Sequence, residues 1–290
     1  MVSVEDQSPP QWFRDALAQS GQPGRVDVNG ASIAYRSWGE PDTPGVVLIH
    51  GGMANQNWWD HIAPFLASGR RVVTLDLAGH GDSDRRSEYR FEEFIDEVLA
   101  VASAGRIAGP PILVGHSMGG IVAYAASARC PEQIAGVIVF DSPVRDMTPE
   151  ERAMRADITA HPPRIYPTVE AAVARYRLVP AQNYAEPYIL EHVGRQSLRE
   201  VDGGWGRKFD QNRMGRSNSR QLEGTVAGTA VAYFRSENGI VDDDLLDRMR
   251  PMLGPDAWVI DLPEAGHHPM FDQPIAMITG IRTVLAAWRR

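Results

Sequence analysis

The chain has 290 residues, of which 43% are hydrophobic and 23% are charged, a composition typical of a soluble protein with a sizeable core. Its formal net charge of −8 argues against nucleic acid or an anionic membrane surface as the main partner, because both favour a basic face. The single cysteine, Cys130, excludes an intramolecular disulfide and a multi-cysteine metal site, and it fits a reducing compartment.

The N-terminal stretch has no apolar core of signal-peptide length, and no run of about 18 apolar residues occurs in the chain. We therefore expect a cytoplasmic protein with a small-molecule substrate. We expect no nucleic-acid or membrane partner, and a monomer or a homodimer.

In chain order, the first half alternates between short apolar runs and longer amphipathic segments. Strands are predicted at 32–39, 45–50, 71–76, 111–116 and 136–141, and helices at 58–69, 91–105 and 119–130. Most of the strand runs are apolar throughout, as in strands that are covered on both faces. Strands that alternate with helices indicate a mostly parallel sheet, in which sites form beyond the carboxyl ends of the strands.

Beyond Asp141 the pattern changes to arginines, acids, prolines and aromatic residues without a buried strand. Here we expect helices that start near Thr148 and over 168–179, and an irregular loop over 202–221. The alternation then resumes with strands at 229–235 and 257–263 and helices at 242–253 and 274–290. The sequence thus predicts a core of residues 1–141 and 226–290, with a helical insertion at 142–225 after the strand at 136–141, which corresponds to the sixth strand of the complete sheet.

The sequence GHSMGG at 115–120 places Ser117 between a predicted strand and a predicted helix. The pattern G-x-S-x-G in this context is a nucleophile elbow. Gly115 and Gly119 leave room for a tight turn, and Gly120 allows the helix to pack close to the sheet. The motif therefore predicts Ser117 to be a nucleophile at a helix N-terminus, where developing negative charge is stabilised.

With three further motifs, this elbow resembles the α/β-hydrolase superfamily. The motifs are LIHGG at 48–52, similar to the family's loop after a strand, DLAGHGDS at 76–83, similar to its D-x-x-G-x-G-x-S turn, and EAGHHPMFDQP at 264–274, similar to its histidine loop. The resemblance implies an α/β-hydrolase fold, in which a mostly parallel central sheet is flanked by helices. The insertion at 142–225 resembles the family's cap, or lid, domain.

A serine hydroxyl needs an adjacent base, and the resemblance implies a histidine for this role. In the family the catalytic histidine directly follows a glycine, which matches His267 rather than His268. His50, His80 and His116 also lie near predicted strand ends, and the resemblance implies that they shape loops.

The base in turn needs a carboxylate that fixes its tautomer. The family's usual acid follows the strand after the cap, where this chain has Asn238, which cannot carry the charge. Two substitutes are present. Asp141 ends the strand after the nucleophile helix, as in those family members that take their acid from that strand, and Glu237 lies one residue before the usual position. We predict Asp141, with Glu237 as the alternative.

The resemblance also implies an oxyanion hole formed by the backbone N–H groups of Met118 and Gly52. The candidate substrate-binding residues are Met53, Trp58, Trp59 and, in the cap, Tyr166. For Trp58 and Trp59, core packing of an amphipathic helix explains the sequence equally well.

These features predict a serine hydrolase that cleaves an ester, lactone or similar carbonyl bond of a small, largely apolar substrate through an acyl-enzyme intermediate. The reaction needs no metal or organic cofactor. Carbon–carbon bond hydrolysis and cofactor-free perhydrolysis are alternatives that use the same triad. An alternative of another class is a hydrolase-like protein that binds a ligand without turnover. Asn238 at the position of the family's usual acid is the feature that supports this alternative.

Overall fold

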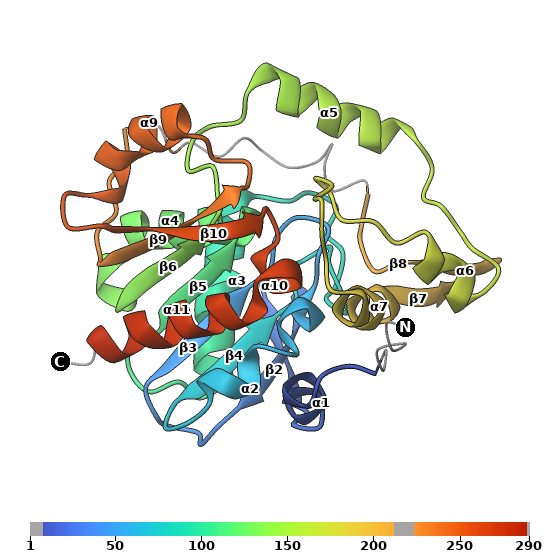
Figure 1. Ribbon diagram of the computed structural model, residues 1–290, viewed down its shortest axis with the longest axis horizontal. Helices are drawn as coiled ribbons and strands as arrows, with labels where there is room; N and C mark the ends of the chain where they lie inside the picture. The colour runs from blue at the N-terminus through green and yellow to red at the C-terminus, as the bar shows by residue number, and fades with distance from the viewer. Residues whose placement is uncertain (1–7, 212–221, 223, 289–290) are drawn as a thin grey trace, which may run out of the picture.

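The computed structural model of the protein describes residues 8–211, 222 and 224–288. An eight-stranded sheet crosses its centre in the order β1-β2-β4-β3-β5-β6-β9-β10 (Figure 1). Its strands are β1 (Gln22–Val28), β2 (Ala31–Trp38), β3 (Gly45–Ile49), β4 (Arg71–Leu75), β5 (Ile112–His116), β6 (Gly136–Phe140), β9 (Val231–Asn238) and β10 (Trp258–Gly266). From β4 to β10 all neighbouring strands pair in parallel, whereas β1 and β2 join antiparallel. The predicted mostly parallel sheet flanked by helices is confirmed.

Two hydrophobic clusters fill the space on the two faces of the sheet. Strand β3 shows the alternation, because Val47 and Ile49 belong to one cluster whereas Val46 and Leu48 belong to the other. Helices α3 (Phe91–Ala104), α4 (Met118–Arg129) and α9 (Asp243–Leu253) cover the first face, and α1 (Gln11–Leu17), α2 (Ala63–Leu66), α10 (Pro269–Asp272) and α11 (Pro274–Ala287) cover the second (Figure 1). Two short 3₁₀ turns, η1 (Gln56–Trp59) and η2 (Pro131–Gln133), complete this part. Because β3 and β6 are buried on both faces, they contain no polar side chain.

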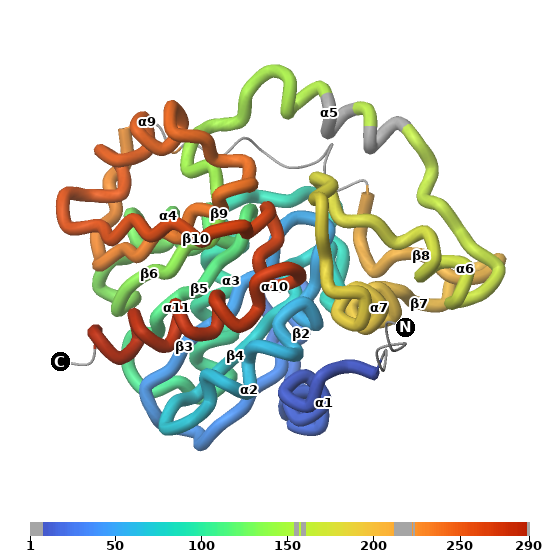
Figure 2. Tube along the Cα trace, viewed as in Figure 1, coloured from blue at the N-terminus to red at the C-terminus, as the bar shows by residue number. Residues whose placement is uncertain are grey.

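The insertion between β6 and β9 contains α5 (Pro149–Ala160), α6 (Val169–Ala174), α7 (Pro187–Gln196), β7 (Leu198–Val201) and β8 (Gly204–Arg207). Figure 2 traces this segment along the top and one side of the molecule. The expectation of an irregular loop is wrong for 204–207, where β8 pairs antiparallel with β7 through a turn at Asp202 and Gly203. β7 and β8 have four residues each, and β8 contains two glycines. Neither has the run of β-branched residues from which a strand is predicted. Residues 212–221 of the expected loop lie outside the described residues, and the domain boundaries stay a prediction.

The predicted helix over 58–69 is also wrong, because the structure divides this segment into η1 and α2. Pro64 lies in the first turn of α2, where its missing N–H group costs nothing. In the middle of a longer helix the same proline would remove a hydrogen bond, so the segment forms two short turns.

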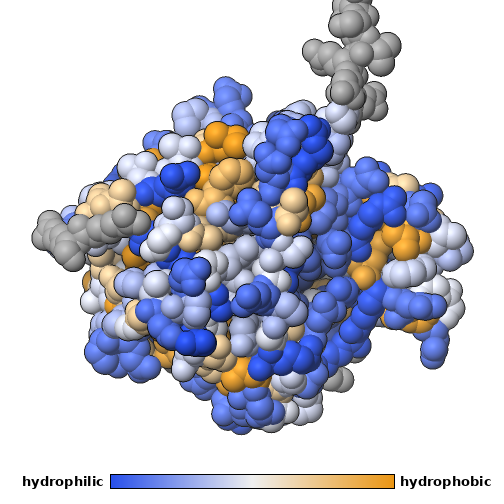
Figure 3. All heavy atoms as spheres, turned by 90° about the horizontal axis from the view of Figure 1, so that it is seen from below, coloured by the Kyte–Doolittle hydropathy of each residue, from blue (hydrophilic) through white to orange (hydrophobic). Residues whose placement is uncertain are grey.

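The surface carries hydrophobic residues as separate patches within a largely hydrophilic face (Figure 3). Among the described residues, no helix is both long enough and apolar enough to cross a membrane.

The centre of the sheet offers a test of the packing. Phe140 and Phe234 are partners across β6 and β9, with ring centroids 4.7 Å apart, and both are buried. We expect Phe234→Ala to lower the free energy of unfolding by about 3–5 kcal/mol, because it removes contacts and leaves a cavity. Urea unfolding measures this change. The control Ile275→Ala, at a position that is 51% exposed, should change it by less than about 0.5 kcal/mol. Equal effects would contradict the packing described here.

Candidate active site

Ser117 occupies a strained turn between β5 and α4. Its backbone angles, φ of +52° and ψ of −118°, lie in a region that residues other than glycine rarely adopt. The neighbouring glycines make the turn possible. A Cβ atom on Gly115 would lie 2.3 Å from the carbonyl oxygen of Gly119, and one on Gly119 would lie 2.3 Å from that of Ile49. The helix can therefore start against the ends of β3 and β5, with Ser117 partly exposed at the turn.

The structure brings Ser117 together with His267 and Asp141. The Nδ1 atom of His267 lies 2.7 Å from Oδ2 of Asp141, and its Nε2 atom lies 3.1 Å from Oγ of Ser117. An ionised carboxylate only accepts hydrogen bonds, so in the neutral imidazole Nδ1 carries the proton and Nε2 accepts from the serine hydroxyl. The three side chains follow β5, β6 and β10, whose carboxyl ends meet at one edge of the parallel sheet.

The carboxylate of Asp141 is fully buried and is fixed from a second side. The backbone N–H of Ile240 donates to Oδ2 at 2.9 Å, and a Cβ atom on Gly239 would lie 2.3 Å from the same oxygen. The loop after β9 therefore wraps closely around an acid that comes from β6. The alternative acid, Glu237, is exposed, and its carboxylate accepts the N–H of Glu264 at 2.8 Å instead.

The loop after β3 lies against the elbow. A Cβ atom on Gly51 would lie 3.3 Å from Cβ of Ser117. One on Gly52 would meet no atom of the described residues within 4 Å, its two chain neighbours aside. His50 holds this loop. Its Nε2 atom accepts the N–H of Leu77 at 3.1 Å, so Nδ1 carries the proton and donates to the carbonyl of Gly51 at 2.7 Å. Because C=O and N–H point in opposite directions across a trans peptide, the N–H of Gly52 faces away from His50.

Two further histidines pack around His267, a feature that the sequence analysis missed. Nε2 of His116 donates to the backbone carbonyl of His267 at 2.7 Å, and the His268 ring centroid lies 4.6 Å from that of His267. Burial, followed by the proximity of His267, lowers the pKa of His116 well below its usual value and that of His268 to about 3. Both rings therefore stay neutral at physiological pH. The adjacent pair at 267–268 is visible in the sequence, but nothing there relates residue 116 to residue 267.

The predicted substrate-binding residues divide into several settings. Trp58 packs edge-to-face on His268, with centroids 5.4 Å apart, and so lies next to the site. Trp59 is fully buried in the core, which corrects its prediction as a pocket wall in favour of core packing. Met53 is partly exposed beside Gly52, with a φ of +59°. Tyr166 pairs through its backbone with Trp205 inside the insertion.

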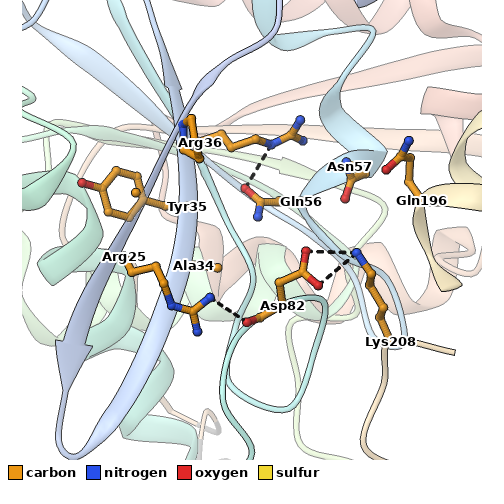
Figure 4. Close-up of a pocket in the computed structure, with 11 residues that line it drawn as sticks. Arg25, Ala34, Tyr35, Arg36, Gln56, Asn57, Asp82, Gln196 and Lys208 are labelled. Atoms are coloured by element: carbon orange, nitrogen blue, oxygen red, sulfur yellow. Dashed lines mark hydrogen bonds and ion pairs between the residues drawn. The ribbon is translucent and has the colours of Figure 1, made fainter. Parts of the chain in front are cut away.

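A separate cavity of about 390 Å³ opens between β1, β2, η1 and the insertion (Figure 4). Arg25 and Lys208 both point toward Asp82, which accepts from Arg25 through its backbone carbonyl and from Lys208 through its carboxylate. Arg36 donates to Gln56 on the other side. Ser117 and His267 do not line this cavity, and its cationic groups already have partners. It therefore does not extend the site around Ser117.

The sequence model of the alpha/beta hydrolase family matches residues 46–279, and the chain belongs to this family. It is 25% identical over 270 residues to an esterase of Mycobacterium tuberculosis, a match that covers 89% of this chain and 88% of that protein. It is 33% identical over 119 residues to a proline iminopeptidase of Pestalotiopsis fici, but this match spans only 39% of the chain and 42% of that protein. Among solved structures, E-2-(acetamidomethylene)succinate hydrolase superposes with a TM-score of 0.76 at 22% identity, over 92% of this chain and 99% of that one. At this identity the superposition shows the fold.

The geometry predicts which acid serves the histidine. We expect Asp141→Asn to slow the reaction of Ser117 with a fluorophosphonate probe by about 10⁴-fold, because the amide favours the wrong tautomer of His267. Glu237→Gln, the matched control, should react within about twofold of the wild type, since Glu237 is exposed and its carboxylate accepts from the backbone N–H of Glu264 rather than from His267. Labelling rates followed by intact-protein mass spectrometry measure both. The opposite order of the two variants would contradict the assignment of Asp141.

Proposed function

We propose that the protein is a serine hydrolase that cleaves an ester, lactone or similar carbonyl bond of a small, largely apolar substrate. The observation that carries the proposal is that His267 is hydrogen-bonded through both ring nitrogens, at 2.7 Å to Asp141 and at 3.1 Å to Ser117. A serine hydroxyl is a weak nucleophile, and this chain of contacts is what activates it. The similarity to an esterase along nearly its whole length supports an ester as the substrate.

In the proposed reaction, Oγ of Ser117 attacks the substrate carbonyl while its proton moves to Nε2 of His267. The buried carboxylate of Asp141 stabilises the imidazolium that forms. His267 then gives the proton to the leaving group, and an acyl-enzyme remains. A water molecule, deprotonated by the same histidine, attacks the acyl-enzyme and releases the acid and free Ser117.

The negative charge on the substrate oxygen needs donors that are already in position. We assign these donors to the backbone N–H groups of Gly52 and Met118, on the loop after β3 and at the start of α4. Apart from its two chain neighbours, no atom of the described residues lies within 4 Å of a Cβ position on Gly52, which supports this assignment because it leaves space for a substrate oxygen. The N-terminus of α4 adds a favourable dipole.

The alternative of a ligand-binding protein without turnover depended on Asn238 at the usual acid position. Asp141 provides a carboxylate for His267 from the neighbouring strand β6, so Asn238 leaves no gap in the proposed triad. This contact favours turnover over a receptor role.

The direct test is steady-state hydrolysis of nitrophenyl esters with acyl chains of increasing length. We expect multiple turnovers in the wild type and a loss of at least about 10⁴-fold in Ser117→Ala, because the nucleophile is removed. Ser236→Ala is the matched control, since Ser236 is buried on β9 and its hydroxyl has no partner in the described part of the chain. This variant should keep its activity. Equal turnover in Ser117→Ala and the wild type would overturn the proposal.

His50 is proposed to position the oxyanion donor through the carbonyl of Gly51. We expect His50→Phe to lower kcat by about 10- to 100-fold with little change in KM, because the oriented N–H matters most in the transition state. His50→Asn can still donate from its amide to Gly51 and should recover part of the loss. Parallel losses in both variants, accompanied by a lower melting temperature, would show a purely structural role.

A further inference from the structure

Three histidine rings form one buried cluster at the proposed active site. His116, His267 and His268 each offer a ring nitrogen, and these nitrogens lie within 4.8 Å of one another. The ring centroids are 4.6 to 5.3 Å apart, and none of the three side chains is more than 3% exposed. The proposed reaction uses only His267, so the cluster needs an explanation of its own.

The hydrogen bonds fix the tautomer of every ring. His116 and His268 each direct Nε2 at a backbone carbonyl, that of His267 at 2.7 Å and that of Pro180 at 3.2 Å. A carbonyl only accepts, so both Nε2 atoms carry the proton and both Nδ1 atoms keep a lone pair. Both Nδ1 atoms are buried, and neither has a hydrogen-bond partner among the residues that the structure describes. In His267 the two ring nitrogens have the opposite roles, because Nδ1 donates to Asp141 and Nε2 keeps the lone pair.

This arrangement matches the requirements of a three-histidine metal centre. Histidine ligands of metals are neutral, and they donate their second ring N–H to a carboxylate or a backbone carbonyl. All three rings meet this condition. Three imidazole nitrogens with a fourth position open to another ligand are a set that zinc accepts, whereas magnesium and calcium prefer oxygen ligands.

We propose that His116, His267 and His268 bind one Zn²⁺ ion, and that this ion inhibits the enzyme. The inhibitory effect rests on the function proposed above. The lone pair on Nε2 of His267 can accept the proton of Ser117 or bind the metal, but it cannot do both. Binding therefore removes the base without any change of fold, and a chelator restores it. The ion is an inhibitor of this site and not a cofactor of the reaction.

The coordination geometry of the ion can be derived from the same contacts. A tetrahedral zinc site with Zn–N bonds of about 2.0 Å separates its ligands by about 3.3 Å, so the three rings must rotate slightly toward one another. Ser117 is partly exposed and lies 3.1 Å from Nε2 of His267, which makes its oxygen available as the fourth ligand.

Isothermal titration with ZnCl₂ tests the site without relying on activity. We expect one Zn²⁺ per chain in the wild type and in Ser117→Ala, which keeps all three rings. Binding to His268→Phe should be weaker by about 100-fold or more, since one ligand is lost. His61→Phe is the matched control, because His61 is also buried, directs Nε2 at the carbonyl of Met270 and leaves Nδ1 without a partner. That variant should bind zinc like the wild type.

Ester hydrolysis in the presence of ZnCl₂ and after addition of EDTA completes the test, with each variant compared to its own metal-free rate. Zinc binding without any ester turnover would retain the metal site and overturn the serine hydrolase. Turnover without stoichiometric zinc binding, or equal binding in His268→Phe and the wild type, would overturn the metal site. If His268→Phe does not fold, Co²⁺ is added to the wild type instead. A tetrahedral cobalt site absorbs strongly in the visible range, so the absence of this absorption would contradict the proposed metal site.

Discussion

The contact between His267 and Asp141 is the interaction on which the geometry of the site depends. It joins the chain segments that follow β6 and β10, which are separated in the sheet by β9. The loop after β9 closes around the same carboxylate, with the N–H of Ile240 on Oδ2 and Gly239 at close range. Three strand ends are thus tied together by one buried acid. Without it the ring of His267 would have no fixed tautomer to present to Ser117.

The second constraint is the strained turn at Ser117. A residue with φ of +52° at the start of a helix persists only when the surrounding backbone leaves no alternative. Here Gly115 and Gly119 permit contacts of backbone on backbone that any side chain would prevent. His116, between the strand and the serine, uses its ring to hold the carbonyl of His267. The elbow and the histidine loop are therefore coupled directly, and the three buried rings are a consequence of this coupling.

The insertion and the core are joined by a different set of contacts. Helix α7 of the insertion contacts η1 of the core, where His192 binds Asp60, and α1 adds Phe13 against Tyr188. These contacts place the insertion next to the segment that carries Trp58. The polar cavity in Figure 4 is lined by residues of β1, β2 and η1 and contains paired charges. None of the three histidines of the cluster lines that cavity.

The sequence by itself determined the fold class and the position of Ser117, because continuous apolar strands, a G-x-S-x-G turn and its flanking glycines are local features. It also predicted His267, and it predicted Asp141 as the acid with Glu237 as the alternative. Only the packing of β6 beside β9 decides which of these carboxylates reaches the ring. The sequence missed β8 and the break between η1 and α2, and it left open whether Trp59 lines a pocket or packs in the core. Only the tertiary structure brings the ring of His116 to the carbonyl of His267, which lies 151 residues later in the chain. Side-chain contacts of this kind depend on how strands align in space, and no local propensity encodes them.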